Sequence, residues 1–325
     1  MNLAIGYFFL IIVLISFELL YFRLAERFQI IDKPNQRSSH SQPTIRGAGI
    51  IFPIVILIWF SFYFSWQWFV LGALFIAIVS FADDLKPVSS VLRVSTHVLA
   101  MLLLFYQLSL FEWPVLLLSA AFIISVGALS AFNFMDGING ITGLYALVNF
   151  ITFFAINMWV TVFTDSALLI FISIAVLIFL FFNLRKKARC FSGDVGSVSL
   201  AFVQIFLMFQ LISTTDNLMW VGVCLVFGVD AVLTIIDRIR LGENIFKPHR
   251  QHVYQYLSNE LGWSHNLVSI FYVVLQFLIN LIIVFAYLYQ QFWIVPALIV
   301  TYSICFMGLR IAVIKKVKLR ISRQN

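Results

Sequence analysis

The sequence predicts an all-α polytopic membrane protein with about eleven transmembrane helices, and three observations lead to this fold class. Of the 325 residues, 62% are hydrophobic and only 11% are charged, and the mean hydropathy is +1.01. A water-soluble core of this size does not need that much apolar surface. Apolar windows of roughly 20 residues, the length that crosses a bilayer, recur along the chain. The basic residues lie on or beside alternate connections between these windows and on the tail.

The windows leave no room for a soluble domain, so we expect residues 1–325 to form a single membrane domain. We place them at 3–22, 48–66, 67–82, 91–111, 113–132, 141–163, 166–184, 196–214, 217–237, 267–289 and 292–314. The third window is short and nearly touches the second. The first lacks a preceding basic residue and a small-residue cleavage pattern, which indicates a retained span rather than a signal peptide.

The basic residues predict the orientation. All 21 Lys and Arg fall on one set of connections, on the tail or at the adjoining ends of windows (Arg93 and Arg310), and the short connections opposite hold none. The positive-inside rule then places the N-terminus outside and the C-terminus in the cytoplasm. The cytoplasmic segments would be 23–47, 83–93, 133–140, 185–197, 238–266 and a basic tail at 315–325.

The polar residues gather at the same ends of the windows, and the middle of the membrane is almost free of ionisable groups. Ion-coupled transporters usually carry such groups near the midplane, so this distribution argues against transport. The cysteines lack a CxxC spacing and lie in or beside apolar runs, which makes a disulfide framework or a zinc site unexpected. They are Cys190, Cys224 and Cys305.

The first acidic motif, SFADDLKP, follows the third window. It carries the adjacent carboxylates Asp83 and Asp84, with Lys86 two residues further on. Such a pair beside a cation can position a metal or accept a proton. The plain alternative is the capped end of a helix.

The second acidic motif, NFMDGING, follows the fifth window and carries Asn133, Asp136 and Asn139 at a spacing of three. If the helix continues through the motif, these groups stack on one face. If Gly137 and Gly140 break the helix, the backbone can approach a ligand closely. An ordinary glycine turn remains the alternative, although such a turn does not require this spacing of amides and carboxylate.

Two further motifs suit phosphate. FSGDVGS opens the eighth window with Asp194, which could be an N-cap, while a helix N-terminus also favours phosphate. The segment ENIFKPHRQHVYQYL supplies Lys247, His249, Arg250 and His252. Its H-x-x-H spacing could indicate a transition-metal site, but no cysteine or third histidine accompanies it. A basic cluster for phosphate or nucleotide binding fits better.

Hard oxygen ligands, basic loops and phosphate-binding turns together predict Mg²⁺ and a polyphosphate substrate. At the cytoplasmic interface, this combination favours an enzyme that joins a soluble nucleotide donor to a lipid phosphate. Two alternatives stay open. A lipid-linked sugar transporter without chemistry is disfavoured by the empty midplane, and a non-catalytic membrane scaffold leaves the clustered aspartates unexplained.

In this order, the motifs resemble those of the polyprenyl-phosphate N-acetylhexosamine-1-phosphate transferases (glycosyltransferase family 4), which include the phospho-N-acetylmuramoyl-pentapeptide transferases. The resemblance covers nearly the whole chain. The matching positions are the acidic pair Asp83 and Asp84 with Lys86, then Asn133 and Asp136 of an Asn-x-x-Asp-Gly segment, then Asn183 and Asp194 of an FN…GD-x-GS signature, and finally Asp230, Arg238 and Gly242 before the nucleotide-sugar-selecting loop.

The resemblance implies ten or eleven helices around a cytoplasm-facing cleft in the bacterial inner membrane, often in a homodimer. It implies transfer of N-acetylhexosamine-1-phosphate from a UDP-sugar to undecaprenyl phosphate, with release of UMP, as a first step of O-antigen or cell-envelope polysaccharide synthesis. The partners would be the lipid, the UDP-N-acetylhexosamine and the membrane, and no nucleic acid. We favour direct attack by the lipid phosphate over a covalent aspartyl intermediate.

Residue roles follow from the same resemblance. Mg²⁺ or Mn²⁺ would be held by Asp194 with Asp136, and the catalytic carboxylates would be Asp83, Asp84 and Asp136. The substrate-binding residues would be Asn133, Asn139, Asn183, Lys86, Arg46, His249, Arg250 and His252.

The chain departs from the commoner family pattern at two places. Many members have a second aspartate at the position of Asn139, and many have a His-x-His-His cluster where this chain reads HRQHVYQ. With PNQRSSHSQPTIRGAG at 34–49, this segment resembles the WbpL-like O-antigen branch. That branch implies a UDP-N-acetyl-6-deoxyhexosamine donor, such as UDP-FucNAc or UDP-QuiNAc, with UDP-GlcNAc as the competitor.

Overall fold

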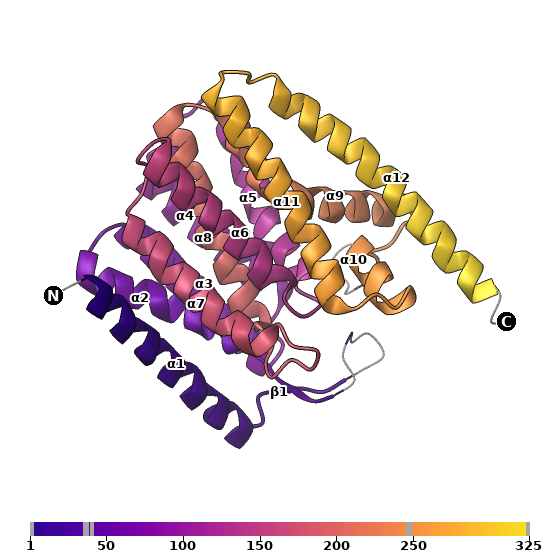
Figure 1. Ribbon diagram of the computed structural model, residues 1–325, viewed down its shortest axis with the longest axis horizontal. Coiled ribbons are helices and arrows are strands. Elements are labelled where there is room, and N and C mark those ends of the chain that lie inside the picture. The colour runs from indigo at the N-terminus through magenta and orange to yellow at the C-terminus, as the bar shows by residue number, and fades with distance from the viewer. Residues whose placement is uncertain (1–2, 35–38, 40–41, 245–248, 323–325) are drawn as a thin grey trace.

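The computed structural model describes residues 3–34, 39, 42–244 and 249–322, and nearly all of their regular structure is helical (Figure 1). The first half contains α1 (Leu3–Arg27), β1 (Ile31–Asp32), β2 (Thr44–Ile45), η1 (Ala48–Ile50), α2 (Ile51–Tyr63), α3 (Gln67–Leu85), α4 (Ser90–Gln107), η2 (Leu110–Glu112), α5 (Val115–Met135) and α6 (Ile141–Trp159). The second half contains α7 (Ser166–Asn183), α8 (Gly193–Thr215), η3 (Leu218–Cys224), α9 (Leu225–Arg240), α10 (Val253–Gln255), η4 (Tyr256–Glu260), α11 (His265–Leu288) and α12 (Ile294–Ser322).

The predicted fold class is confirmed. The described residues include 10 helices that are long and apolar enough to cross a membrane, and one shorter apolar helix at Ala48–Tyr63. Each predicted window coincides with one of these helices. The predicted orientation across the membrane stays a prediction, as does the division into a single domain.

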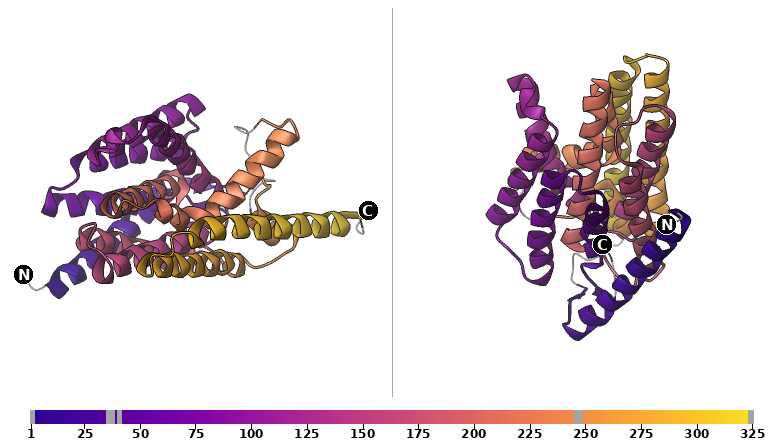
Figure 2. Two further views of the ribbon diagram at one scale, coloured as in Figure 1. Left: turned by 90° about the horizontal axis from the view of Figure 1, so that it is seen from above. Right: turned by 90° about the vertical axis from the view of Figure 1, so that its left-hand side faces the viewer.

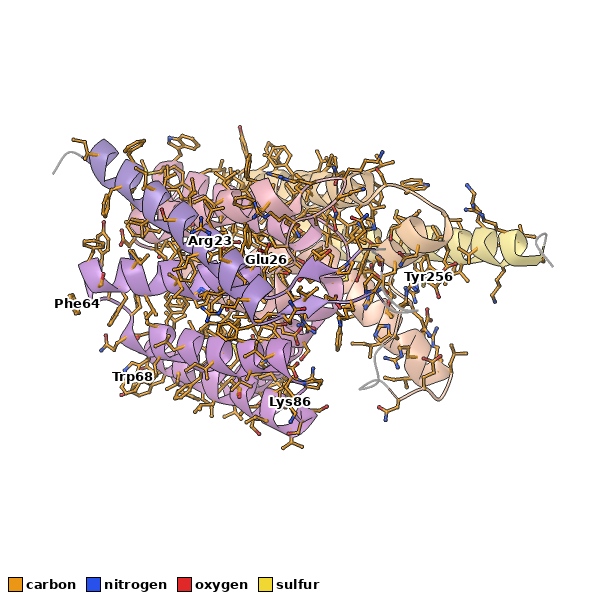
Figure 3. All side chains as sticks on the ribbon, turned by 90° about the horizontal axis from the view of Figure 1, so that it is seen from below. Arg23, Glu26, Phe64, Trp68, Lys86 and Tyr256 are labelled. Atoms are coloured by element: carbon orange, nitrogen blue, oxygen red, sulfur yellow. The ribbon has the colours of Figure 1, made fainter. Side chains whose placement is uncertain are left out.

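The sequence predicted that the third window would be the short one, but the second window gives the shorter helix. Helix α2 has 13 residues, whereas α3 has 19. The aromatic run YFSWQWF continues across the turn, so hydropathy alone does not reveal where α2 ends. Phe64 and Trp66 adopt left-handed backbone angles there, with φ of 49° and 59°, and Phe64 and Trp68 lie at the opposite end of this hairpin from Lys86 (Figure 3).

The predicted cytoplasmic segments are shorter than expected, because the helices continue into them. Helix α3 runs to Leu85, α5 runs to Met135, and α8 begins at Gly193. In the described part of the predicted tail, α12 continues to Ser322, because Lys, Arg, Ile and Leu are compatible with helix and neither Gly nor Pro interrupts them. Lys247 and parts of two predicted loops (35–38, 40–41 and 245–248) lie outside the described residues, as do residues 323–325.

Helix α8 is the centre of the bundle, and its most apolar 18-residue stretch is 100% buried. Phe206 of α8 stacks on Phe69 of α3, with ring centroids 3.9 Å apart. Helix α12 is mostly exposed, since only 17% of its most apolar 18-residue stretch is buried. It lies at the edge of the bundle and extends beyond its neighbours (Figure 2). The core therefore surrounds α8, and the position of the α8 N-terminus determines where the polar groups meet.

Two loops pair at the N-terminus of α8. The amide of Phe191 donates to the carbonyl of Ile45 (2.7 Å), and the amide of Gly49 donates to the carbonyl of Ser192 (2.9 Å). A Cβ on Gly49 would overlap the backbone of Gly196 in α8, which explains why both positions are glycine. This pairing brings the segment after β2, and with it Arg46, beside the first turn of α8.

Candidate active site

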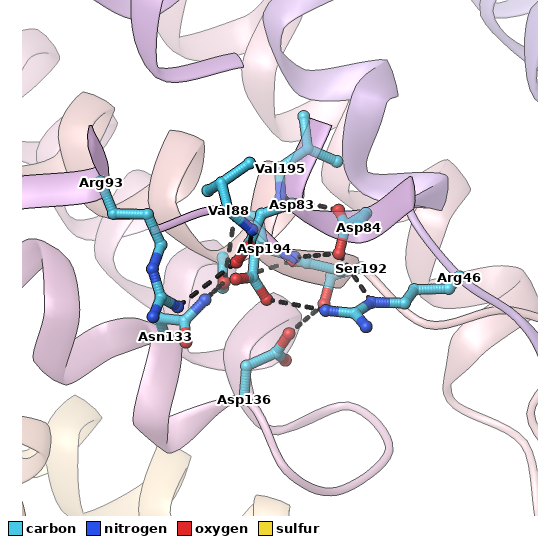
Figure 4. Close-up of polar contacts among 12 residues, drawn as sticks. Arg46, Asp83, Asp84, Val88, Arg93, Asn133, Asp136, Ser192, Asp194 and Val195 are labelled. Atoms are coloured by element: carbon cyan, nitrogen blue, oxygen red, sulfur yellow. Dashed lines mark hydrogen bonds and ion pairs between the residues drawn. The ribbon is translucent and has the colours of Figure 1, made fainter. Parts of the chain in front are cut away.

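Four aspartates from separate parts of the chain converge at the N-terminus of α8 (Figure 4). Asp83 and Asp84 occupy the last turn of α3, Asp136 directly follows α5, and Asp194 lies in the first turn of α8. These positions correct the sequence interpretation, because neither Asp83 nor Asp84 lies in a loop. Asp194 is not the N-cap, which is Ser192.

Asp84 supports the N-terminus of α8 from outside that helix. Its carboxylate accepts hydrogen bonds from the amides of Asp194 (2.8 Å) and Val195 (3.0 Å). These are two of the amides that a helix N-terminus leaves without intrahelical partners. The carboxylate side chain is 0% exposed and also accepts from Arg46 Nε at 2.7 Å. Asp84 therefore fixes the positions of Asp194 and Arg46.

The glycine before Asp194 allows this close approach. Gly193 has φ of +69°, and a Cβ at this position would overlap the carboxylate of Asp84. A larger residue would suffer both the left-handed backbone and the steric overlap. The glycine of FSGDVGS is thus required by the contact between α3 and α8.

Asp83 has a different set of partners, although it is adjacent to Asp84 in sequence. It accepts from the amide of Val88 (2.6 Å) and from Arg93 Nη1 (3.3 Å). Successive residues of a helix point about 100° apart, so the two carboxylates diverge. Arg93, on the first turn of α4, was not among the predicted site residues, since a single arginine after a basic loop carries no distinctive sequence signal.

Arg46 is the cation between the carboxylates. Its Nη2 lies 3.2 Å from Asp194 Oδ1, in addition to the contact with Asp84. Burial lowers the pKa of Arg46, but the carboxylates of Asp84 and Asp194 outweigh that effect and raise it above its usual value. Tyr21 Oη donates to the Arg46 carbonyl (2.6 Å), which fixes the backbone at this residue.

Asp136 is the carboxylate of the NFMDGING turn, and it accepts a hydrogen bond from Ser192 Oγ. Burial raises the pKa of Asp136 to about 6. Near neutral pH the side chain thus changes protonation state easily, which suits a group that meets a metal ion or a phosphate.

The raised pKa of Asp136 predicts a pH-dependent stability. Because the folded-state pKa of about 6 exceeds the ordinary value of 3.8, the contribution to stability is complete below about pH 4 and is lost as the pH rises through 6. We expect Asp136→Asn to raise the free energy of unfolding by about 1–3 kcal/mol at pH 8 and to change it little at pH 4. Denaturant titrations in EDTA at both pH values measure the free energy of unfolding of the variant and of the wild type.

The matched control is Asp216→Asn, which makes the same chemical change at an exposed position after the other end of α8. It should retain the wild-type pH dependence. If the free energies of unfolding of Asp136→Asn and of the wild type change in parallel from pH 4 to pH 8, Asp136 is not held with a raised pKa.

Two cavities meet at these carboxylates. Cavity A has a volume of about 330 Å³ and includes Asp136 and Asn183 in its lining. Cavity B, of about 490 Å³, includes Asp83 and Arg93. Both cavities are lined by Arg46, Asn133 and Asp194. A ligand in cavity A and a ligand in cavity B would therefore meet beside the same arginine and aspartate.

A third space, cavity C, continues from cavity A and has a volume of about 800 Å³. The two share Asn139, Phe191 and His265 in their linings. The basic residues of cavity C are Arg185, Lys186, Lys187 and Arg250. Together A and C form a space that is larger than either alone, with aspartates in A and basic side chains in C.

The remaining predicted residues divide among these cavities. His249 and His252 line cavity B, whereas Arg250 between them lines cavity C. Lys86 is exposed, and within the described part of the chain it does not belong to the lining of cavity A, B or C. Arg93 on α4, rather than Lys86, is the cation that contacts Asp83 of the acidic pair.

Asn183 ties two motifs together. Its Oδ1 accepts from the amide of Gly140 (2.7 Å), and its Nδ2 donates to the carbonyl of Cys190 (2.8 Å). These two bonds join the turn after α5 to the segment before α8. The side chain that borders cavity A is thereby held in a fixed orientation.

Asn139 is an amide for a visible reason. Its Nδ2 donates to the carbonyl of Arg185 at 2.9 Å, and its own carbonyl accepts from Ser269 Oγ at 2.8 Å. A carboxylate at this position could not donate, and it would face the Arg185 carbonyl oxygen. The departure from the commoner aspartate thus accompanies a contact that only the amide can make.

This contact predicts that Asn139→Asp lowers the free energy of unfolding by about 1–3 kcal/mol at pH 8, since a buried carboxylate would face an acceptor. Asn217→Asp is the matched control, because Asn217 caps η3 through Oδ1, which accepts from the amide of Met219, and Asp caps equally well. Thermal unfolding of both variants measures the difference. Equal melting temperatures for the two would mean that the Asn139 contact contributes nothing.

No group of three or more His, Cys, Asp or Glu side chains among the described residues is arranged to hold a metal ion. Mg²⁺ does not need such a group, because it commonly uses one or two carboxylates and completes its shell with substrate phosphates and water. Asp136 and Asp194 both line cavity A. The donor set therefore fits a Mg²⁺ site that is completed by a substrate phosphate, and does not fit a preformed protein cage.

Comparison with known proteins agrees with this architecture. Residues 66–212 match the model of the glycosyl transferase family 4. An undecaprenyl-phosphate alpha-N-acetylglucosaminyl 1-phosphate transferase of Escherichia coli (strain K12) is 26% identical over 262 residues, which are 71% of this chain and 70% of that protein. A protein of the same description from Salmonella typhi is 25% identical over 260 residues, again 71% of this chain and 70% of that protein. A phospho-N-acetylmuramoyl-pentapeptide-transferase of Symbiobacterium thermophilum is 35% identical over 144 residues, 44% of this chain and 42% of that protein.

The fold and the site define a polytopic membrane protein with a carboxylate-rich polar centre at one end of its central helix. Residues 66–212 are similar to glycosyl transferase family 4, the family that the motifs of the chain resemble.

Proposed function

We propose that this protein transfers an N-acetylhexosamine-1-phosphate from a UDP-sugar to undecaprenyl phosphate and releases UMP. One observation carries the proposal: Arg46, Asn133 and Asp194 line both cavity A and cavity B. Transfer between two phosphate-bearing substrates needs two binding spaces that meet at one charged centre. The relatives are described as transferases of the same class.

The nucleotide sugar fits cavities A and C. A UDP-sugar carries two phosphates, a base and a sugar, and the lysines and arginines of cavity C supply the positive charge for such a ligand. Phe191 and Trp263 add aromatic surface to the lining. The transferred phosphate would then lie in cavity A, next to Asp136 and Asp194.

The lipid acceptor fits cavity B and an adjacent apolar groove. The groove, of about 430 Å³, lies between α5 and α9 and is lined by Ile124, Phe132, Leu225 and Val232, among others. On α5, Phe132 of the groove is followed directly by Asn133 of cavity B. A prenyl chain in the groove could thus carry its phosphate to cavity B.

In this proposal, Asp194 with Asp136 would hold Mg²⁺ or Mn²⁺ when the donor is bound. When bound, the ion would neutralise charge on the transferred phosphate. An oxygen of the lipid phosphate forms a bond to the β-phosphorus of the UDP-sugar, and the bond from that phosphorus to the bridging oxygen breaks, so that UMP leaves. Arg46 would contact the phosphate charge from its fixed position between Asp84 and Asp194.

Asp84 acts in this scheme by positioning, since its oxygens already accept hydrogen bonds from α8 and Arg46. Asp83 instead fixes Arg93, which lines cavity B. A phosphate monoester is largely ionised at neutral pH, with a second pKa near 6. The acceptor therefore does not need a strong base, and direct attack is favoured over an aspartyl intermediate.

The proposal also concerns which sugar the UDP-linked donor carries. The segment 34–49 and the HRQHVYQ sequence favour a UDP-N-acetyl-6-deoxyhexosamine such as UDP-FucNAc or UDP-QuiNAc, for O-antigen synthesis at the bacterial inner membrane. The E. coli relative is described as an N-acetylglucosaminyl transferase, which makes UDP-GlcNAc the competing donor. In either case the site would face the cytoplasm.

A donor panel tests the proposal. Purified protein is incubated with undecaprenyl phosphate, Mg²⁺ and, separately, UDP-GlcNAc, UDP-FucNAc, UDP-QuiNAc or UDP-glucose, and UMP is quantified. We expect release with at least one UDP-N-acetylhexosamine, fastest with a 6-deoxy sugar, and little with UDP-glucose. Folded protein that releases no UMP with any UDP-N-acetylhexosamine would overturn the proposed function.

A further inference from the structure

An apolar crevice lies between α7 and α1, which forms one edge of the bundle (Figure 1). The two helices contact each other through two aromatic pairs, Tyr7 with Phe171 (ring centroids 6.3 Å apart) and Phe22 with Phe182 (5.0 Å). The crevice has a volume of about 300 Å³, and its lining among the described residues consists of Ile, Leu and Phe alone. The lining residues between the two aromatic pairs are Ile11, Ile15, Ile174, Leu177 and Ile178.

Two arginines lie at one end of this crevice. The guanidinium carbons of Arg185 and Arg189 are 5.6 Å and 5.9 Å from the ring centroid of Phe182, which belongs to the crevice lining. The guanidinium of Arg189 also lies 4.7 Å from the ring of Phe22 on α1. The face of an aromatic ring attracts a cation at such distances. Positive charge is thus concentrated where the second aromatic pair closes the crevice.

The chain after α7 holds both arginines at this position. The amide of Arg189 donates to the carbonyl of Phe182 (3.0 Å), so the segment after the helix turns back onto its last turn. Arg185 Nε donates to the carbonyl of Phe181 (2.8 Å). Both arginine side chains are exposed, and among the described residues neither forms an ion pair with Asp or Glu. Two positive charges beside one ring repel each other, and an anion that contacts both would offset this repulsion.

The crevice and the arginines together match an anionic lipid. The crevice is open on the outer side of α7, where Leu177 is 54% exposed and Phe181 is 67% exposed, so an apolar chain can enter it from the membrane. The arginines can then meet a phosphate at the end of that chain. Basic sites between transmembrane helices bind the headgroups of anionic membrane lipids in this way.

The crevice is separate from the spaces assigned to the two substrates. Among the described residues, it shares no lining residue with cavities A, B and C or with the groove between α5 and α9. Arg189 likewise lines none of these four spaces, whereas Arg185 also borders cavity C. A lipid in the crevice would therefore lie outside the path of the lipid acceptor. Glycerophospholipids form the bulk of the bilayer around α1 and α7, which favours them as occupants over a scarcer prenyl phosphate.

We propose that the crevice between α1 and α7 binds an anionic glycerophospholipid. One acyl chain lies between Ile11 and Ile15 of α1 and Leu177 of α7, and the phosphate contacts Arg189 and Arg185. The lipid joins α1 to α7, because it fills the space that the two aromatic pairs leave between these helices. This site goes beyond the proposed function and does not depend on it, since the bound lipid takes no part in the transfer reaction.

Lipid binding in detergent tests the proposal. Delipidated protein is titrated with phosphatidylglycerol and, separately, with phosphatidylcholine of the same acyl chains, and the bound lipids are counted by native mass spectrometry. We expect phosphatidylglycerol to bind more tightly. Arg189→Gln should raise the Kd of phosphatidylglycerol about fivefold, the effect of one basic side chain at an anionic lipid, and should leave the Kd of phosphatidylcholine unchanged. Ile15→Trp, which fills the crevice, should weaken the binding of both lipids.

Arg27→Gln and Ile12→Trp are the matched controls. Arg27 lies over the ring of Phe28 (5.9 Å) at the end of the same helix, and Ile12 is an exposed apolar residue of α1, but neither Phe28 nor Ile12 lines the crevice. Each control should keep both Kd values within about twofold of the wild type. Melting temperatures identify any variant that fails to fold. If Ile15→Trp does not fold, Arg189→Gln alone decides the question, because its side chain is exposed.

Unchanged phosphatidylglycerol binding in either folded variant, an equal loss in its matched control, or equal Kd values for the two lipids would overturn the inference. Displacement of phosphatidylglycerol by an equal concentration of farnesyl phosphate would also overturn it, because the crevice would then be a second place for a prenyl phosphate. None of these results requires turnover. Arginine-dependent lipid binding without UMP release would leave the crevice site standing and refute the proposed function alone, and UMP release with unchanged lipid binding would refute the crevice site alone.

Discussion

Asp194→Asn is expected to lower the turnover of UMP release at least about 1,000-fold while the protein stays folded. The backbone amide of Asp194, rather than its side chain, donates to Asp84, so the support of α8 by α3 survives the substitution. An amide oxygen can also still accept from Arg46. What the variant loses is the negative charge that would hold the metal ion beside the transferred phosphate.

Turnover and the melting temperature of the same preparation test this expectation. Asp216→Asn, the same chemical change at the opposite end of α8, should retain wild-type turnover. If Asp194→Asn keeps more than about a tenth of the wild-type rate, Asp194 is not the principal metal ligand.

Asp84→Ala should have the largest effect on stability of any single substitution at the site. It removes the acceptor for two α8 amides and the partner of Arg46 at once. We expect the free energy of unfolding to fall by about 2–4 kcal/mol, because both buried amides lose their acceptor and the guanidinium keeps only Asp194. Turnover should fall as well, since Arg46 and Asp194 would no longer be held in place.

Asp83→Ala provides the comparison within the same acidic pair. Asp83 accepts from one amide and from the half-exposed Arg93, so its loss should cost about 1–2 kcal/mol. Denaturant unfolding measures both variants. Equal destabilisation by the two substitutions would contradict the assignment of Asp84 as the support of α8.

The helices could be predicted from the sequence because bilayer-crossing segments have a strong and local signal. Length and hydropathy located every apolar helix of the described residues, and they failed at the turn between α2 and α3, where the aromatic run hides the end of a helix. The motifs around Asp136 and Asp194 were also recognisable, since a carboxylate between glycines is unusual beside an apolar window.

The division of labour within the site could not be predicted in this way. Asp83 and Asp84 look equivalent as neighbours, and only the contact of α3 with α8 shows that one of them supports a helix terminus. Lys86 looked like the cation of the acidic pair, but the hairpin of α3 and α4 brings Arg93 there instead. Asn139 stays predicted as a substrate contact, since it lines cavities A and C, but the bond from its amide to the carbonyl of Arg185 depends on tertiary structure.

The meeting of the cavities depends entirely on tertiary structure. Arg46 follows β2, Asn133 ends α5 and Asp194 begins α8, so nothing local relates the residues that border both cavities. The H-x-x-H segment illustrates the same limit, because His249 and His252 border one cavity while Arg250 borders another.

The released nucleotide is the most direct test of the proposed reaction. Purified protein is given undecaprenyl phosphate and a UDP-N-acetylhexosamine labelled in the β-phosphate, and the products are separated and identified by mass. Transfer of the sugar phosphate predicts UMP and, in equal amount, a lipid that carries the label, the sugar and two phosphates. Release of UDP, with a lipid that carries the sugar on a single unlabelled phosphate, would contradict it.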